Sequence, residues 1–405
     1  MFGWSMPRFL IVFLTLLLAA CATTPTEREQ AQTRPLTILI SIDGFRSDYL
    51  EAGATPVLAE LAAEGARGPM RPSFPSLTFP NHHTLVTGLH PDHHGVVGNN
   101  FDDPVLGRFS QAKKETPWWN EAEPIWVTAE KAGLTTASIF WPGSETEIRG
   151  RRPTYWRPYD SEVGNRARVD QVLAWLDQAD ARPDLVTLYF DVVDTVGHDT
   201  GPGSPETLAA ASQVDAAIGG LVQGLKDRGV YDRTTLVIVS DHGMAPIRPD
   251  QTIYLNDAVP AGALDVIYVS GVAYLAPTPG HEAEVDAALI GRRDHYECWR
   301  RGEIPARFVL GSNPRVPPIV CLADIDWYLA THVRPLTHAG GAHGFDNAST
   351  EMQALFIAHG PGIARGVVLK DMDSVDVQPL LGRLLGVAVP AGDGRAADTL
   401  PAMRR

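Results

Sequence analysis

The sequence predicts an α/β fold with a doubly wound, mostly parallel sheet that is flanked by helices and carries a small inserted α+β cap. Three observations lead to this prediction. Apolar runs of strand length alternate with longer segments of helical periodicity, which is typical of a parallel sheet with helices on both faces. Three of the apolar runs end in Asp or His side chains. The alternation stops over one long stretch with loops rich in Gly and Pro and then resumes, as expected for an insertion.

Five apolar runs are predicted to be strands because each is short, rich in β-branched and aliphatic residues and bounded by polar loops. They span residues 36–42, 135–140, 185–190, 236–240 and 352–358. Apolar residues recur at helical spacing between them, which predicts helices over residues 56–65, 167–178, 205–228 and 377–385. This βα order assigns residues 36–250 and 340–395 to a catalytic domain.

Residues 251–339 interrupt this order and are predicted to form a cap inserted into the catalytic domain. They contain only short β-like pieces, at 266–275 and 307–310, between loops. Cys298 and Cys321 also lie here, and two Cys in an exported protein usually form one disulfide. Two buried free thiols are the alternative. Neither Cys has His or Asp at metal-ligand spacing, so neither is expected to bind metal.

The N-terminal residues 1–20 are predicted to be a signal peptide of the lipoprotein type. Arg8 precedes an apolar run of about a dozen residues, which is short for a membrane-spanning helix. The run ends in Leu18-Ala-Ala-Cys21, which resembles a bacterial lipobox, so Cys21 is expected to be lipidated. An ordinary cleaved secretory signal is the alternative. Residues 21–35 are rich in Thr, Glu and Gln and are predicted to be a flexible tether. The expected location is the cell envelope, in the periplasm, with a lipid anchor in the outer membrane.

The formal net charge of -14 limits the partners of the chain. General binders of nucleic acid or of anionic membranes rely on basic surface, so neither sequence-specific nucleic-acid binding nor membrane contact beyond the lipid anchor is expected. An acidic protein can still bind a small phosphate ester when metal cations dominate the local field. The sequence leaves the oligomeric state open.

Six Asp and His side chains, of the kinds that bind metal ions and called metal-type side chains below, are predicted to converge at one edge of the sheet. Five of them follow strands directly or closely, and the sixth lies far down the chain. Ligands gather at the carboxyl ends of strands in an open α/β sheet. Three Asp and three His suit zinc or manganese and are enough for two ions. The six residues are Asp43, Asp194, His198, Asp241, His242 and His343.

Thr78 is the candidate nucleophile. It follows the Pro- and Ser-rich loop 71–77, and Pro80-Asn81 resembles a helix start, with Gly88 near its end. Thr78 would then lie just before a helix N-terminus, where N–H groups and the dipole favour a phosphate. A bound divalent cation would lower the pKa of its hydroxyl, as it does for water. The alternative is that Thr78 only caps the helix.

Taken together, these motifs resemble the nucleotide pyrophosphatase/phosphodiesterase family (type I phosphodiesterases) of the alkaline phosphatase superfamily. The bacterial branch is especially similar. The matching residues are Ser-Ile-Asp43-Gly-Phe-Arg, Pro-Ser-Leu-Thr78-Phe-Pro-Asn-His, Asp194 with His198, Ser-Asp241-His242-Gly-Met, Gly-Ala-His343-Gly-Phe-Asp and the stretch 88–99. The resemblance covers nearly all of residues 36–389. Each motif is weak by itself, and their joint presence in order carries the assignment.

The resemblance implies an alkaline-phosphatase-like fold, two Zn²⁺ per chain and a covalent intermediate on Thr78. One zinc would be held by Thr78 together with Asp43, Asp241 and His242, and the other by Asp194, His198 and His343. The residues alone leave this division open, and they would also accept Mn²⁺. Asn99 matches the family asparagine that binds a non-bridging phosphate oxygen with the backbone N–H of the nucleophile. A neutral amide there favours a singly charged diester over a monoester dianion.

Three aromatic residues are candidates for stacking a nucleobase: Phe79, Tyr159 and Tyr189. Core packing is the alternative for each. Asp191 and His338 are candidates for orienting metal ligands. The other histidines near Thr78 are expected to hold the loop by hydrogen bonds and not to bind metal; they are His82, His83, His90, His93 and His94.

The predicted function is a zinc-dependent phosphodiesterase and nucleotide pyrophosphatase that works through a phosphothreonine. Its substrates would be small nucleotide esters and pyrophosphates. A phosphomonoesterase, a phosphonate hydrolase or a lysophospholipid-type phosphodiesterase on the same scaffold is the enzymatic alternative. A sulfatase is disfavoured because the nucleophile is Thr, not Cys or Ser. A surface-binding lipoprotein without activity is the alternative from another class.

Overall fold

A nine-stranded mixed sheet forms the centre of the structure, a computed structural model that describes residues 1, 34–178 and 181–404. Eight strands follow the order β19-β2-β18-β8-β1-β7-β5-β6, and β20 pairs with β2. Most neighbouring strands are parallel. The strands are β1 (Leu36–Ile42), β2 (Ala66–Arg71), β5 (Thr136–Ile139), β6 (Tyr155–Arg157), β7 (Leu185–Phe190), β8 (Thr234–Val239), β18 (Ala354–His359), β19 (Val367–Val368) and β20 (Met372–Asp373).

The three central strands β1, β7 and β8 are buried along their whole length. Continuous apolar sequences suit this position because helices cover both faces of a parallel sheet. One central strand breaks the parallel pattern: β18 runs antiparallel to both of its neighbours, β8 and β2. The chain returns from the inserted region at the carboxyl edge of the sheet, so the next strand has to run away from that edge.

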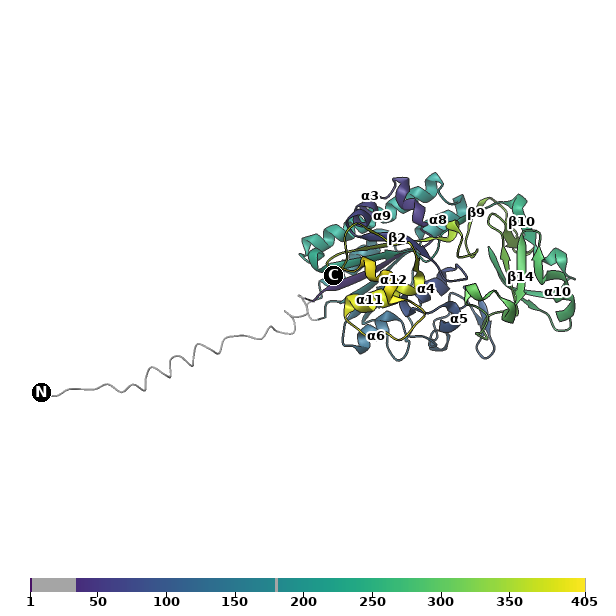
Figure 1. Ribbon diagram of the computed structural model, residues 1–405, viewed down its shortest axis with the longest axis horizontal. Helices are drawn as coiled ribbons and strands as arrows, with labels where there is room; N and C mark the ends of the chain where they lie inside the picture. The colour runs from purple at the N-terminus through teal and green to yellow at the C-terminus, as the bar shows by residue number, and fades with distance from the viewer. Residues whose placement is uncertain (2–33, 179–180, 405) are drawn as a thin grey trace.

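Helices form one layer on each face of the sheet (Figure 1). In β1, Ile38 and Ile40 face one apolar core, and Leu39 faces the other. The predicted α/β, doubly wound, mostly parallel fold is confirmed. The first core is covered by α3 (Pro56–Glu64), α7 (Asn165–Leu176) and α9 (Pro205–Asp227), and the second by α4 (Thr78–Thr87), α6 (Ile125–Lys131) and α11 (Val377–Leu385).

A second, antiparallel sheet of five strands lies at one end of the molecule, to the right in Figure 1. It falls within the predicted insert and has its own apolar core. The residue bounds of the two domains stay predictions. Arg307–Leu310 was expected to be β-like but is not a strand, because residues 306–308 form a short 3-10 helix. The order is β11 (Leu264–Val269), β12 (Val272–Pro277), β15 (Ile319–Ala323), β14 (Tyr296–Arg300) and β13 (Gly291–Arg293), with α10 (Glu282–Leu289) beside it.

The two ends of this region are joined by β9 (Ala245–Ile247) and β17 (Gly340–Ala342), which pair antiparallel. A further short pair joins β10 (Thr252–Tyr254) to β16 (Tyr328–Ala330). Since β9 follows Asp241-His242 closely and β17 directly precedes His343, this pairing brings sequence-distant metal-type residues together.

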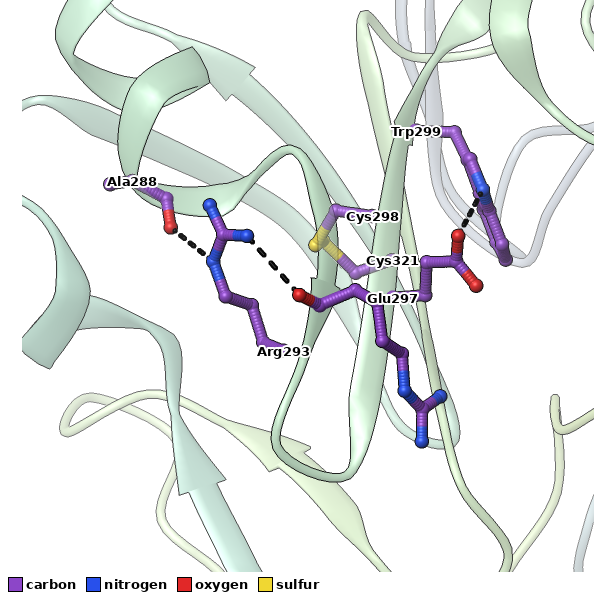
Figure 2. Close-up of a disulfide and its surroundings, with 7 residues drawn as sticks. Ala288, Arg293, Glu297, Cys298, Trp299 and Cys321 are labelled. Carbon is purple, nitrogen blue, oxygen red and sulfur yellow. Dashed lines mark hydrogen bonds between the residues drawn. A yellow bond between two sulfur atoms is a disulfide. The ribbon is translucent and has the colours of Figure 1, made fainter.

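Cys298 and Cys321 lie directly opposite each other on β14 and β15 and are joined by a disulfide, as Figure 2 shows. Beside it, the Arg293 side chain donates to the carbonyl oxygen of Ala288, and the indole N–H of Trp299 donates to Glu297. Both cysteines are buried in the core of the inserted sheet, and neither belongs to a group of metal-type side chains.

Residues 2–20 of the predicted signal peptide, Cys21 and residues 22–33 of the predicted tether lie outside the described residues. The lipid anchor and the envelope location therefore stay predictions. Among the described residues, no helix is long and apolar enough to cross a membrane.

Candidate active site

The six predicted metal-type side chains form two groups at the carboxyl edge of the sheet. Asp43 follows β1 and Asp241-His242 follow β8, while His343 follows β17. Asp194 and His198 lie one turn apart on α8 (Val192–Thr200). The ligand atoms of each group lie within 4.8 Å of one another. The groups are Asp43, Asp241 and His242, and Asp194, His198 and His343, which is the division that the family resemblance implies.

Glycines permit this close assembly. Gly44 has φ of 65°, and a Cβ on it would lie 2.9 Å from a carboxylate oxygen of Asp194. A side chain at Gly340 would collide with the carbonyl oxygen of His198. The backbone of β17 therefore packs directly on α8, which brings His343 next to His198, with ring centroids 5.0 Å apart.

Each of the three imidazoles uses Nδ1 to bond a backbone carbonyl oxygen. The acceptors are Gly341 for His198 at 2.8 Å, Gly243 for His242 at 2.9 Å, and Ser76 for His343 at 2.9 Å. A carbonyl oxygen only accepts, so the proton lies on Nδ1 and the Nε2 lone pair of each ring is left for a ligand. This arrangement orients metal-binding histidines in proteins.

Three buried carboxylate oxygens in the two groups have no hydrogen-bond partner: Oδ1 of Asp43, Oδ1 of Asp194 and Oδ2 of Asp241. A buried carboxylate oxygen without a partner is costly, and a bound cation removes that cost. The donor set, its orientation and these three oxygens all fit divalent cations.

The carboxylates also crowd one another electrostatically. Burial and the nearby Asp194 raise the pKa of Asp241 to about 8. Burial, together with repulsion from Asp241 and Asp194, raises the pKa of Asp43 well above its usual range. Burial opposes ionisation of Asp194 as well, but His198 and His343 hold the pKa of that carboxyl below its usual range. Protein groups alone therefore do not keep all three carboxylates ionised at neutral pH, whereas bound cations would.

Thr78 is the first residue of α4, so the helix begins two residues earlier than the expected start at Pro80. The residue at the cap position is Leu77, and the helix start has no side-chain cap. The alternative that Thr78 only caps the helix is therefore wrong. Its hydroxyl oxygen lies 3.3 Å from Nε2 of His242, next to the first group. Asn81 secures the preceding loop, because its amide bonds backbone groups of Ser73, Pro75 and Leu77.

Asn99 lies beside the start of the same helix. Its Oδ1 accepts the backbone N–H of Phe79 at 3.0 Å. The amide nitrogen of Asn99 is thereby left as a donor at the end of α4 where Thr78 lies.

A cavity of about 270 Å³ opens from these residues. Asp43, Thr78 and Asp194 line it together with the predicted aromatic residues Phe79 and Tyr159, and Tyr189. Residues that sequence reasoning did not identify as site residues also line it, namely Gln111, Lys114, Phe140 and Glu145. The Lys114–Glu145 ion pair, 2.6 Å long, contributes a charged patch to the wall.

The two predicted tyrosines play different parts. Tyr189 is buried, and its hydroxyl donates to Oδ2 of Asp43, so it contacts a metal-type carboxylate as well as the cavity. Tyr159 is half exposed, and its hydroxyl donates to Asp191 at 2.6 Å. Asp191 in turn forms an ion pair with the buried Arg168 at 3.1 Å. Asp191 thus fixes the position of Tyr159 in the cavity wall, a role that the sequence did not predict.

The other histidines near Thr78 were expected to hold the loop by hydrogen bonds, and for His83 this is wrong, because neither of its buried ring nitrogens has a hydrogen-bond partner within the described part of the chain. His82 is buried, its Nδ1 donates to the carbonyl oxygen of Thr78 at 2.9 Å, and its Nε2 contacts the Ser41 hydroxyl. His94 contacts the Thr84 hydroxyl within the same helical region. His338 is exposed and contacts only the Thr337 hydroxyl among the hydrogen bonds of the described residues, so the expectation that it orients a ligand is wrong.

Comparisons with known proteins agree on one family. The sequence profile described as type I phosphodiesterase / nucleotide pyrophosphatase matches residues 37–346. An uncharacterised pyrophosphatase/phosphodiesterase of Schizosaccharomyces pombe is 36% identical over 399 residues, which cover 91% of this chain and 80% of that protein. Human ectonucleotide pyrophosphatase/phosphodiesterase family member 5 is 33% identical over 392 residues, with 96% and 81% covered. The chain spans a smaller share, 41%, of human family member 1, with 35% identity over 378 residues.

Solved structures lead to the same result. Murine ectonucleotide pyrophosphatase/phosphodiesterase 5 superimposes with a TM-score of 0.88 at 34% identity, and the match covers 92% of this chain and 100% of that chain. An inactive threonine-to-alanine variant of that murine protein, in complex with AMP, gives a TM-score of 0.87 at 33% identity with the same coverage. These relatives are eukaryotic, so the special similarity to the bacterial branch stays a prediction. The chain belongs to the type I phosphodiesterase / nucleotide pyrophosphatase family and is a phosphoric diester hydrolase.

Proposed function

We propose that this protein hydrolyses nucleotide phosphodiester and pyrophosphate bonds in a zinc-dependent reaction through a phosphothreonine on Thr78. One observation carries the proposal: Thr78 is the first residue of a helix, its hydroxyl lies beside the first metal-type group, and it lines the cavity. A nucleophile, a site for the phosphate and space for the rest of the substrate therefore meet at one point.

Two Zn²⁺ ions are the proposed cofactors. Asp43, Asp241 and His242 would hold one ion together with Thr78. Asp194, His198 and His343 would hold the other. When bound, such ions lower the pKa of hydroxyl groups and offset charge that develops on phosphate oxygens. The same nitrogen and carboxylate donors accept Mn²⁺, and availability in the cell decides between the two metals.

The chain's own residues supply positioning and the covalent step. The phosphate would lie against the first turn of α4, where backbone N–H groups favour anions. The Thr78 oxygen then loses its proton to solvent and attacks phosphorus. Its bond to phosphorus forms, the bond to the leaving oxygen breaks and that oxygen takes up a proton, while the retained nucleoside ester stays on the phosphothreonine. Water subsequently hydrolyses the phosphothreonine and releases the phosphorylated product. The Asn99 amide nitrogen would donate to a non-bridging oxygen, and a neutral donor there suits the single charge of a diester.

The substrate class follows from the cavity and from one relative. Phe79, Phe140 and Tyr159 present aromatic surface in the cavity, and aromatic rings stack on nucleobases. The murine relative with the threonine-to-alanine change was solved with AMP. We therefore place the nucleoside part of the substrate in this cavity, with its phosphate at Thr78.

Hydrolysis of bis-p-nitrophenyl phosphate against p-nitrophenyl phosphate tests the proposal, with chelation followed by zinc add-back. Strong preference for the diester, lost on chelation and restored by zinc, is the expected result. Preference for the monoester would favour the phosphomonoesterase alternative. Turnover that is unaffected by chelation would contradict a metal-dependent reaction, and no turnover of either ester would favour a binding protein.

The metal-free protein is expected to lose thermal stability as the pH rises from about 7 to about 9, because Asp241 and His198 release protons on unfolding. The pKa of Asp241 is about 8 in the fold, so the folded state keeps a proton that the unfolded chain gives up near its usual range of about 4. The stability linked to that proton is fully present below the unfolded pKa and is lost as the pH rises through 8. Burial opposes protonation of His198, but Asp194 raises the pKa of this imidazole to about 9, which acts in the same direction.

Thermal unfolding of the chelated protein across this range, with the zinc-loaded protein in parallel, measures the effect. The loaded protein should change less, because bound cations keep the carboxylates ionised. Equal pH dependence of the two forms would show that these groups do not bind the metal.

A further inference from the structure

The segment 92–121 carries Asn99 and two residues of the cavity wall, Gln111 and Lys114. Its conformation is fixed largely by the inserted sheet. Tyr274 of β12 is fully buried, and its hydroxyl donates to the carbonyl oxygen of Val97 at 2.6 Å. This bond crosses from the inserted sheet to the residue two positions before Asn99.

The ring of Tyr274 also packs on the next residue of the segment. A Cβ on Gly98 would lie 2.7 Å from Cε2 of Tyr274, so the ring lies directly against the Gly98 backbone. Real Cβ atoms do not approach ring carbons this closely, and only glycine fits. Tyr274 therefore fixes both residues that precede Asn99, one by a hydrogen bond and the other by packing.

Tyr268 adds a second contact from the same face of the sheet. It pairs directly with Tyr274 across β11 and β12, so the two rings point to the same side. Burial raises the pKa of the Tyr268 phenol, and the neighbours that oppose this rise include Ser270 and Asn99. The hairpin of β11 and β12 thus reaches Asn99 as well as the residues before it.

Ion pairs and hydrogen bonds join the segment 92–121 to the inserted region on both sides of Asn99. Asp92 accepts the backbone N–H groups of residues 311–313, which belong to the inserted region. Arg315, also in that region and 4% exposed, donates to the carbonyl oxygen of Gly95 and pairs with Asp103 at 2.7 Å. A buried arginine satisfied by several acceptors makes a rigid junction. The segment around Asn99 is therefore bonded to the inserted region on both sides.

We propose that Tyr274 is a positioning residue for Asn99, so that the inserted sheet sets the geometry of the phosphate contact. The proposal rests on the role given to Asn99 in the proposed function. Oδ1 of Asn99 is fixed by the Phe79 N–H, and the direction of its Nδ2 then depends on the backbone at residues 97–99, which Tyr274 holds.

Tyr274→Phe removes one hydroxyl and leaves the ring against Gly98. Loss of one positioning hydrogen bond is expected to lower kcat/KM for bis-p-nitrophenyl phosphate about 3- to 10-fold. Tyr296→Phe is the matched control, because Tyr296 is a buried tyrosine on β14 of the same sheet, two strands away from β12. It should leave kcat/KM unchanged. Melting temperature and metal content of each variant are measured alongside.

A double-mutant cycle that combines Tyr274→Phe with Asn99→Ala separates positioning of Asn99 from a general structural effect. In the Asn99→Ala background, Tyr274→Phe is expected to change kcat/KM by less than about twofold, because the group that it positions is gone. An equal fall in both backgrounds, or no fall with Asn99 intact, overturns the inference while the role of Asn99 stands. An Asn99→Ala variant with unchanged kcat/KM overturns the role of Asn99 and the inference with it. Gly98→Ala, which pushes the segment away from the ring, is a second variant for the same cycle and should couple to Asn99 in the same way.

Discussion

Replacing Thr78 by alanine is expected to lower kcat by at least about 10⁴-fold, the scale seen when a covalent nucleophile is removed from other enzymes. The hydroxyl is the attacking group, and a methyl side chain offers no oxygen to form the phosphothreonine. The fold and the carboxylates should be unaffected, because Thr78 caps no helix and its hydroxyl contacts only His242 among the hydrogen bonds of the described residues. The melting temperature should therefore stay near that of the unchanged protein, and most of the bound metal should be retained.

Thr87→Ala provides the matched control for this variant. Thr87 is buried at the other end of α4, and its hydroxyl donates to the carbonyl oxygen of His83, away from the two metal-type groups. It should keep kcat within about threefold, since it removes only one local hydrogen bond. Single-turnover labelling of the unchanged protein should place phosphate on Thr78. Retained turnover in Thr78→Ala at normal metal content would exclude the covalent mechanism.

The sequence predicted the site best where a continuous apolar strand is followed at once by Asp or His side chains. The strand at residues 36–42 has the predicted bounds, and 185–190 does as well, because fully buried parallel strands are continuous apolar runs. The polar residues directly after them were therefore placed correctly at the carboxyl edge. Asp194 and His198, four residues apart, lie on one face of a helical turn as their spacing requires.

Other features depend on contacts that no local pattern carries. The direction of β18 follows from where the chain leaves the inserted region, not from its apolar residues. Arg307–Leu310 has a β-like composition, but Pro305 and the ion pair of Arg307 with Asp346 belong to an irregular connection. Tyr274 has no sequence signal for function, because its importance arises only when a distant strand packs on Gly98. Lys114 likewise reaches the cavity through an ion pair with Glu145, 31 residues away in sequence.

Asp241→Asn is expected to abolish metal-dependent turnover and yet to stabilise the metal-free protein. The amide removes an anionic ligand from the group around Thr78, so metal content should fall below that of the unchanged protein and kcat/KM should fall by at least about 10³-fold. In the metal-free state the carboxylate is costly, since burial and Asp194 raise its pKa to about 8. An uncharged amide avoids that cost, so the metal-free variant should melt at a higher temperature than the metal-free parent at about pH 9.

Asp215→Asn is the matched control, because Asp215 is also a buried aspartate but accepts the backbone N–H groups of Val57 and Leu58 at the start of α3. This change should lower the melting temperature and leave metal content and kcat/KM nearly unchanged. If the melting temperature rises in metal-free Asp241→Asn and falls in Asp215→Asn, the Asp241 carboxylate destabilises the metal-free fold and serves to bind a cation. A metal-free Asp241→Asn protein that melts lower than its parent would mean that the carboxylate stabilises the fold without a cation, and that its place in the metal site has to be revised.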